Sequence, residues 1–273
     1  RLMRASVRQA WTSLFRYVVV SGLLLLVGGI VAIFIAIALR LDIPTLSEAL
    51  VGRGRAETWF SIKLTAVTTT TTTVIAVLIG IPAGYALSRY RFPFHTLLDT
   101  IIDLPIVLPP LVAGIALLVF FGTTAGVWIE ENIIPFVYTQ QGIILAQLVP
   151  AGSFPVRTLK AAFDSVHPRM EHVARSLGCN ERQAFFRVVL PQARNGLVAG
   201  AVMTWARAAG EFGPILMFCG ATKMKTETLP IAVFLNMSVG DIGMALSLTV
   251  ILVILAASAL LIFKALGGRG YLW

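Results

Sequence analysis

The sequence predicts an all-α polytopic membrane protein, and three observations lead to that fold class. Apolar residues make up 57% of the 273-residue chain and charged residues only 13%, whereas soluble domains average about 45–50% apolar and about 25% charged residues. Several apolar runs exceed the roughly 18 residues that indicate a membrane-spanning helix. These runs do not alternate apolar and polar residues as barrel strands do. We therefore expect a single transmembrane domain over residues 1–273.

The apolar runs predict about six membrane spans. The first run follows four arginines and is too long for the core of a signal peptide, so we expect a retained helix there. Pro150, Gly152 and Pro155 should break the fourth span, and Arg207 and Glu211 interrupt the fifth. The predicted spans are residues 17–39, 60–88, 101–121, 142–162, 197–219 and 242–263.

Three prolines in the segment I-I-D-L-P-I-V-L-P-P at 101–110 open the third span. Each proline frees a helical carbonyl group, and in a membrane only neighbouring helices can satisfy such a group. The third span is therefore predicted to lie buried in the helix bundle.

The distribution of basic residues predicts the orientation. Cytoplasmic loops of membrane proteins carry an excess of Lys and Arg. With both termini in the cytoplasm, the inner segments hold fifteen of the 22 Lys and Arg residues and the outer loops hold five. The inner segments are 1–16, 89–100, 157–196 and 264–273, and the outer loops are 40–59, 122–141 and 220–241. The chain is thus expected in the cell membrane, with both termini cytoplasmic.

A charged segment between two apolar spans is the most informative motif. It forms the core of an inner element at about 164–191 and reads M-E-H-V-A-R-S-L-G-C-N-E-R-Q-A-F-F-R-V-V-L-P from Met170 to Pro191. Gly178 suits the end of a first short helix, because that position requires a positive φ. Asn180 is a good N-cap for a second helix, which Pro191 should end. Such an element either docks on another protein or lies on anionic lipid.

Polar residues within the spans are candidates for a transport path. Six threonines run from Thr68 to Thr73. Their hydroxyls either bond back to helix carbonyls or line a pore, with Thr69 and Thr72 as the pore candidates.

Arg207 and Glu211 stand four residues apart on one helix face. They either pair with each other, or Arg207 lends positive potential to an anion path. Under the second interpretation, Arg207→Ala should change transport more than assembly.

Other features exclude whole classes of function. The three histidines are scattered, Cys179 and Cys219 are expected at opposite membrane faces, and no metal-ligand spacing occurs. No basic stripe interleaves with aromatic residues, so nucleic-acid binding is not expected. The sequence has no G-x-x-x-x-G-K-[ST] phosphate loop and no catalytic constellation, so we do not expect an enzyme.

The outer loops carry positive charge at Arg53, Arg55, Lys223 and Lys225. This is either ordinary loop charge or a docking surface.

The charged segment resembles the cytoplasmic signature of permeases in ATP-binding-cassette (ABC) importers, which runs from Glu-Ala-Ala through Gly to Leu-Pro. Gly178 and Leu190-Pro191 have the spacing of that family, while Glu171 stands one place early. The variant E-H-V-A-R-x-L-G resembles permeases for molybdate and tungstate. The segments at 103–118, 205–213 and 220–230 are also similar to this sulfate-related group, and the resemblance covers roughly residues 60–265.

This resemblance implies a type I importer (MetI-like) permease fold. It also implies four partners besides membrane lipid: a second copy of this chain, two ATPase subunits and an extracytoplasmic solute-binding protein. ATP and Mg²⁺ would bind the ATPase subunits, and this chain would carry no cofactor. The implied coupling residues are Glu171, His172, Ala174, Arg175, Ser176, Leu177, Gly178, Leu190 and Pro191.

Two alternatives remain at this stage. Within the importer class, the cargo could be sulfate or thiosulfate in place of molybdate or tungstate. Outside it, a secondary transporter would work without ATP and would need no docking helix for an ATPase.

Overall fold

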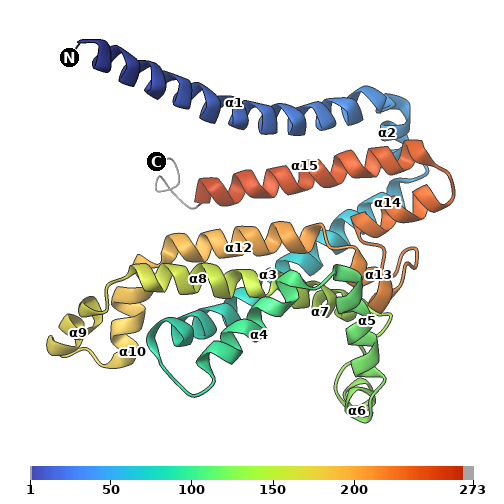
Figure 1. The fold of residues 1–273 in the computed structure, drawn as a ribbon. Helices are drawn as coiled ribbons and strands as arrows, with labels where there is room; N and C mark the ends of the chain where they lie inside the picture. Colours follow the sequence, from blue (N-terminus) through green and yellow to red (C-terminus); the bar gives the residue numbers. More distant parts are fainter. Residues whose placement is uncertain (1, 267–273) are drawn as a thin grey trace.

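The computed structural model describes residues 2–266, with side chains from residue 15 to residue 263, and this part of the chain is helical without strands (Figure 1). Residues 267–273 of the predicted inner segment 264–273 lie outside this description, as do the side chains of residues 264–266 and of Arg1, Arg4 and Arg8. The helices are α1 Leu2–Arg40, α2 Ile43–Leu50, α3 Arg55–Arg89, α4 His95–Val107, α5 Pro110–Phe121, α6 Thr124–Asn132, α7 Gln140–Ala151, α8 Ser153–Ser165, α9 Arg169–Ser176, α10 Glu181–Ala184, a π-helical turn Phe185–Val189, α11 Leu190–Gln192, α12 Arg194–Ala209, α13 Gly213–Cys219, α14 Leu229–Ser238 and α15 Ile242–Leu266.

Three of these helices, α1, α3 and α15, are long and apolar enough to cross a membrane by themselves. They coincide with the first, second and sixth predicted spans. The described apolar side chains of α1 are exposed except for the half-buried Ile37, as expected for a helix that faces lipid along most of its surface. By contrast, α3 packs against α7, α8, α12 and α14 and forms the centre of the bundle (Figure 1).

The third predicted span is not a single buried helix, and that prediction is wrong. The chain bends by 114° between α4 and α5, at Leu108 and Pro109. Pro109 takes an extended conformation, and Pro110 starts α5 at a position where its missing N–H costs nothing. No described residue of α4 is buried. Pro109 and Pro110 therefore break the span, whereas Pro105 is accommodated inside α4.

The fourth and fifth predicted spans are also divided. The break at Gly152, between α7 and α8, bends the chain by 44° and confirms the predicted interruption. The fifth span is split into a 16-residue helix and a 7-residue helix by the turn at residues 210–212. Counting each bent pair as one span, up to five segments of the described chain meet the length and apolarity required to cross a membrane.

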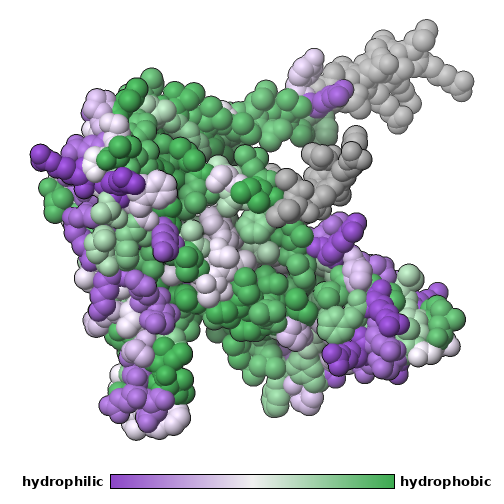
Figure 2. Space-filling model, turned by 180° about the vertical axis from the view of Figure 1, so that it is seen from behind, coloured by the Kyte–Doolittle hydropathy of each residue, from purple (hydrophilic) through white to green (hydrophobic). Residues whose placement is uncertain are grey.

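The molecule has two polar ends. The element from α9 to α11 projects at one end, together with the start of α1, and we call this the α9 end (Figure 1). The outer loops leading to α2 and α14 lie at the opposite end, called the α2 end. The space-filling view shows hydrophilic residues gathered toward both ends, with a largely apolar surface between them (Figure 2). This is the polarity expected of a bundle whose middle lies in lipid.

Clusters of buried apolar residues hold the bundle together. Ile143, Ile215 and Phe218 are fully buried where α7, α13 and α5 meet. Nearer the α9 end, Leu159 and Phe163 of α8 pack with Val189 of the π-helical turn. The second cluster anchors the projecting element to the bundle, so the element is part of the fold and not a free loop.

Candidate functional site: a clamped surface helix and the polar groups of the bundle

The projecting element starts with α9, which ends as the sequence predicted. Gly178 has a φ of +92°, a conformation that residues with a side chain rarely adopt. The N–H of Cys179 donates to the carbonyl of Ala174 at 3.1 Å, and the N–H of Gly178 donates to that of Arg175 at 3.0 Å. This pair of bonds is the Schellman motif, which satisfies carbonyl groups at the end of a helix.

The second helix of the element also begins at the predicted residue. The Asn180 side chain accepts from the N–H of Gln183 at 2.8 Å, and the Gln183 side chain accepts from the N–H of Asn180 at 3.0 Å. This reciprocal arrangement is a capping box. Only two residues, Gly178 and Cys179, separate the Leu177 cap of α9 from Asn180, so the direction of each helix is fixed.

The expectation that Pro191 ends this helix is wrong. Pro191 lies inside α11, and the helix is interrupted two residues later at Ala193, where ψ is 1°. Before it, the N–H of Leu190 bonds to the carbonyl of Phe185, a π-helical i→i−5 spacing. The proline is tolerated because it stands in the first turn of the new short helix, where its N–H is not needed.

The inward side of α9 is clamped to the end of α3. Arg89, the last residue of α3, forms an ion pair with Glu171 at 2.5 Å, and the two side chains are only 10% and 15% exposed. The hydroxyl of Tyr85 donates to the other carboxylate oxygen of Glu171 at 2.9 Å. Ala174, one turn further along α9, is buried on the same side. Glu171 is therefore bound within the fold and is not free for a partner.

Further polar contacts fix the neighbouring turns. Arg89 also donates to the carbonyl of Val166 at 2.6 Å, just before α9. Ser88 donates to Asp164 at 2.5 Å. Tyr90 donates to Glu181 at 2.5 Å, and this hydrogen bond raises the pKa of Tyr90 above its ordinary value. The end of α3 thus holds the segments on both sides of α9.

The outward side of α9 is apolar and exposed. Met170, Val173 and Leu177 recur at a spacing of three and four residues, so they form one row on the helix. Their exposed fractions are 47%, 56% and 81%. Of the other predicted coupling residues, His172, Arg175, Ser176, Gly178 and Pro191 are exposed and Leu190 is half-buried.

Sequence reasoning missed several residues of this site. It did not single out Met170 or Val173, although their spacing with Leu177 is visible in the sequence. It also missed Tyr85, Arg89 and Tyr90, for which no local pattern exists, because they lie about 80 to 90 positions from their partners along the chain.

The threonine run lies mostly inside the protein. Thr69 and Thr72, the two predicted pore residues, have no exposed surface. Thr72 donates to the side chain of Gln147 at 3.0 Å, and the amide of Gln147 reaches Thr69 at 3.4 Å and the Ala208 carbonyl at 3.1 Å. In this conformation the two threonines join α3 to α7 and α12.

Arg207 and Glu211 form the predicted ion pair. Glu211 is 1% exposed at the side chain, whereas Arg207 keeps 33% of its side-chain surface exposed. The pair lies where α12 ends and the turn toward α13 begins. A buried carboxylate requires such a partner.

The family comparison covers most of the chain. Residues 76–269 match the model of the binding-protein-dependent transport system inner membrane component. The chain belongs to this family. It is 32% identical over 243 residues to the sulfate transport system permease protein CysT of Escherichia coli (strain K12), covering 85% of this chain and 87% of that protein. It is 35% identical over 240 residues to the molybdenum transport system permease protein ModB of Mycobacterium tuberculosis (strain ATCC 25618 / H37Rv), covering 86% and 89%.

The fold comparison agrees with that assignment. The structure superposes with a TM-score of 0.69 on a chain from a bacterial ABC transporter involved in the import of the acidic polysaccharide alginate. The match covers 96% of this chain and 99% of the other at 16% identity, so it shows the fold alone. The protein is thus a membrane permease subunit of an ABC importer with the type I fold, and it is not an enzyme by itself.

Proposed function

We propose that two copies of this permease form one membrane pathway and that two ATPase subunits drive it from the α9 end. ATP and Mg²⁺ then bind those subunits and not this chain. An extracytoplasmic solute-binding protein delivers a tetrahedral oxyanion, molybdate or tungstate, to the α2 end. Both termini are cytoplasmic in this arrangement, since the start of α1 and the described end of α15 both lie at the α9 end (Figure 1).

The two-sided character of α9 carries this proposal. One side is fixed to the bundle by Glu171 and Ala174, and the other presents Met170, Val173 and Leu177 to the surroundings. An exposed apolar row flanked by charged residues is typical of a helix that fills a groove on a partner protein. Lipid binding alone would not require the internal ion pair to Arg89.

The same clamp provides a route for force. Movement of a partner that holds the apolar row of α9 would pull on Glu171 and, through Arg89, on α3. With 35 residues, α3 spans about 50 Å and contacts elements along the whole bundle. A displacement at the α9 end would then reach the α2 end as a rigid-body movement, as alternating access requires.

The segment E-H-V-A-R-S-L-G from Glu171 to Gly178 favours molybdate or tungstate as the cargo. A relative named as a molybdenum permease supports this choice. A relative named as a sulfate permease, of similar length and identity, makes sulfate or thiosulfate the second candidate. These tetrahedral anions differ mainly in size, so the solute-binding protein is expected to make the selection.

Docking is tested by placing a charge in the apolar row. Leu177→Asp should abolish co-purification with the ATPase subunit and abolish ATP-driven uptake in proteoliposomes, while the thermal stability of the permease stays the same. Val51→Asp is the matched control, because Val51 is 76% exposed and follows α2 at the other end. Normal co-purification of the Leu177→Asp variant would contradict the proposed docking.

The cargo is tested on the cognate solute-binding protein. Calorimetric titration with molybdate, tungstate and sulfate should show the tightest binding for molybdate or tungstate. ATP-dependent uptake of the preferred anion by the reconstituted transporter should follow the same order. Preferential binding and uptake of sulfate would replace the cargo while leaving the docking proposal intact.

A further inference from the structure

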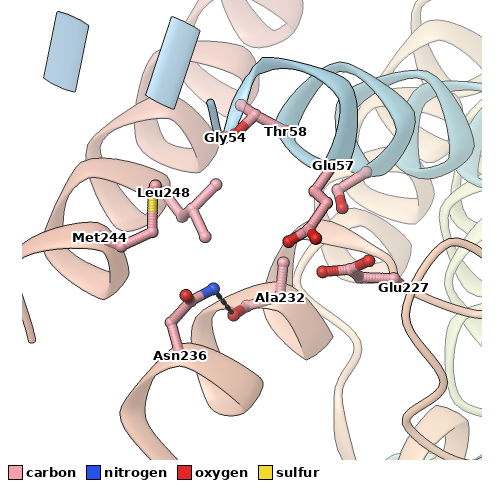
Figure 3. Close-up of a pocket in the computed structure, with 9 residues that line it drawn as sticks. Gly54, Glu57, Thr58, Glu227, Ala232, Asn236, Met244 and Leu248 are labelled. Atoms are coloured by element: carbon pink, nitrogen blue, oxygen red, sulfur yellow. Dashed lines mark hydrogen bonds between the residues drawn. The ribbon is translucent and has the colours of Figure 1, made fainter. Parts of the chain in front are cut away.

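A small cavity lies at the α2 end, away from α9 and from the Arg207–Glu211 pair. It has a volume of about 20 Å³, which is room for one water molecule or one small ion. Its lining comes from the start of α3, the loop before α14, α14 itself and α15 (Figure 3). The polar residues of the lining are Glu57, Thr58, Ser61, Glu227 and Asn236.

Two carboxylates face each other across this cavity. Figure 3 shows Glu57 and Glu227 pointing toward one another. Glu227 is only 1% exposed, and within the described chain its carboxylate receives a hydrogen bond from the N–H of Met224 at 2.9 Å. Burial raises the pKa of Glu227; the Met224 bond opposes this rise, and the nearby Glu57 carboxylate adds to it. Lys223 pairs with Glu57 at 3.1 Å and compensates one of the two charges.

An unpartnered hydroxyl points to a missing ligand. Ser61 is fully buried, lines the cavity, and its oxygen has no hydrogen-bond partner in the described structure. Other hydroxyls of α3 behave differently, since Thr65, Thr68 and Thr73 each donate to a carbonyl one turn earlier. A buried polar group without a partner is costly, so a bound species is expected beside Ser61.

The amide of Asn236 also lines the cavity. Its nitrogen donates to the carbonyl of Ala232 at 2.8 Å, and its side chain lines the cavity on the side opposite the two glutamates (Figure 3). The cavity lining therefore includes carboxylate, hydroxyl and amide oxygens, with the thioether of Met244 beside them. Oxygen donors of this kind are the preferred ligands of hard cations.

We propose that this cavity is a binding site for one divalent cation of the size of Ca²⁺, held by Glu57, Glu227 and the hydroxyl of Ser61. The buried carboxylate of Glu227 and the Lys223-paired carboxylate of Glu57 supply anionic oxygens for a cation. Bidentate carboxylates and side-chain oxygens from several elements suit the flexible coordination of Ca²⁺, whereas Mg²⁺ demands near-ideal octahedral geometry. A water molecule could satisfy Ser61 but would add no positive charge beside the carboxylate of Glu227, which is 1% exposed.

The ion would connect the segments that form the α2 end. Glu57 and Ser61 belong to α3, and Glu227 begins the turn into α14. The lining continues to Met244 and Leu248 on α15. A cation here would fix the loop of residues 220–228, which carries Lys223 and Lys225, against the bundle.

The experiment is a calcium titration of the full chain, with any subunits that co-purify, in nanodiscs of neutral lipid and without nucleotide. Calorimetry should show saturable binding of one Ca²⁺ per chain, with a dissociation constant of about 10⁻⁴ to 10⁻³ M. The Tm should rise with CaCl₂ and not with equal concentrations of MgCl₂ or NaCl. The absence of saturable Ca²⁺ binding in the wild-type chain would overturn the proposal.

Variants assign the binding to the cavity. Glu227→Gln should weaken Ca²⁺ binding by at least about tenfold, while Glu131→Gln, which changes an exposed carboxyl on α6, should bind Ca²⁺ as the wild type does.

Ser61→Ala separates this site from a structural role. Without Ca²⁺ its Tm should equal or exceed that of the wild type, because an unsatisfied hydroxyl is removed, and the Ca²⁺-dependent rise should be reduced. Wild-type calcium affinity in both Glu227→Gln and Ser61→Ala would place the ion elsewhere and refute the assignment.

Discussion

Arg89 at the end of α3 and Glu171 on α9 form an ion pair that is almost entirely enclosed by protein. The pair joins the helix that contacts α7, α8, α12 and α14 to the short surface helix whose other side is apolar and exposed. Because Tyr85 and the carbonyl of Val166 complete the hydrogen bonding, neither charge is left unsatisfied. The arrangement makes Glu171 a positioning residue for α9.

Breaking this pair should separate ATP hydrolysis from transport. In Arg89→Met, the carboxylate of Glu171 loses its partner, and the free energy of unfolding should fall by about 3 kcal/mol. The apolar row of α9 remains, so the ATPase should still bind and hydrolyse ATP. Uptake per ATP hydrolysed should fall at least about tenfold, because α3 no longer follows α9.

The matched control for this prediction is Arg91→Met. Arg91 is exposed, lies two residues further along the chain and forms no ion pair in the described structure. Both variants are compared by ATPase rate and anion uptake in the same proteoliposomes. Equal coupling in Arg89→Met and Arg91→Met would show that the ion pair does not transmit movement.

Gly178 offers a test of how sharply α9 must end. An added Cβ would meet no atom within 4 Å, so Gly178→Ala introduces no clash and acts through the backbone at φ +92°. The cost should be about 1–2 kcal/mol, with a smaller loss for Gly178→Asn, since Asn tolerates positive φ better. Thermal unfolding of the purified permease measures both.

Gly22→Ala is the corresponding control. Gly22 lies within α1, and a Cβ there would also meet nothing within 4 Å. Its backbone is helical, so alanine should leave the stability unchanged or raise it by about 0.5–1 kcal/mol. If Gly178→Ala were as stable as Gly22→Ala, the left-handed cap would have no energetic importance.

The sequence predicted the features that depend on local chemistry. The ends of α9 and α10 follow from a glycine with positive φ and an Asn–Gln capping box, both readable within a few residues. The long spans follow from apolar runs. The division at Gly152 follows from its neighbouring prolines. Each of these signals is contained in one short window of sequence.

The features that the sequence did not predict depend on packing. Prolines in 101–110 could mark either a kinked buried helix or a break, and only the tertiary arrangement chooses the break with its 114° bend. The carboxylate of Glu171 could face a partner or the bundle, and its partners Arg89 and Tyr85 are distant in sequence. Pro191 falls within a helix because a π-helical turn precedes it.

The buried carboxylate of Glu227 predicts a pH dependence of stability. Burial raises its pKa in the folded chain above the value of about 4.3 that it has when unfolded. The folded state therefore holds this proton more tightly than the unfolded state. Stability from this group falls as the pH rises through the two pKa values and is constant above them. Glu57 and Lys223 are the charged groups beside it.

Thermal unfolding from pH 4 to pH 8 in a calcium chelator measures this effect. The Tm of the wild type should fall more steeply with rising pH than that of Glu227→Gln, because the amide has no proton to lose. Glu131→Gln should follow the wild type. Parallel curves for the wild type and Glu227→Gln would show that Glu227 does not titrate differently in the folded chain.

The Arg207–Glu211 pair requires a double substitution. Arg207 alone cannot be removed cleanly, because Arg207→Ala leaves a carboxylate that is 1% exposed without its partner. The single variant should lose about 3 kcal/mol of stability. Arg207→Met combined with Glu211→Gln removes both charges at similar volume. The free energy of unfolding of this double variant should stay within about 1 kcal/mol of the wild type.

The double variant then separates bracing from transport. Because a third of the Arg207 side chain is exposed, we expect its charge to act on the anion, so uptake by the folded double variant should fall about tenfold. Uptake is measured with the ATPase rate, since a lost anion path should leave hydrolysis intact. A double variant that folds and transports at the wild-type rate would leave the pair with a structural role only, and the positive potential along the path would have to come from elsewhere.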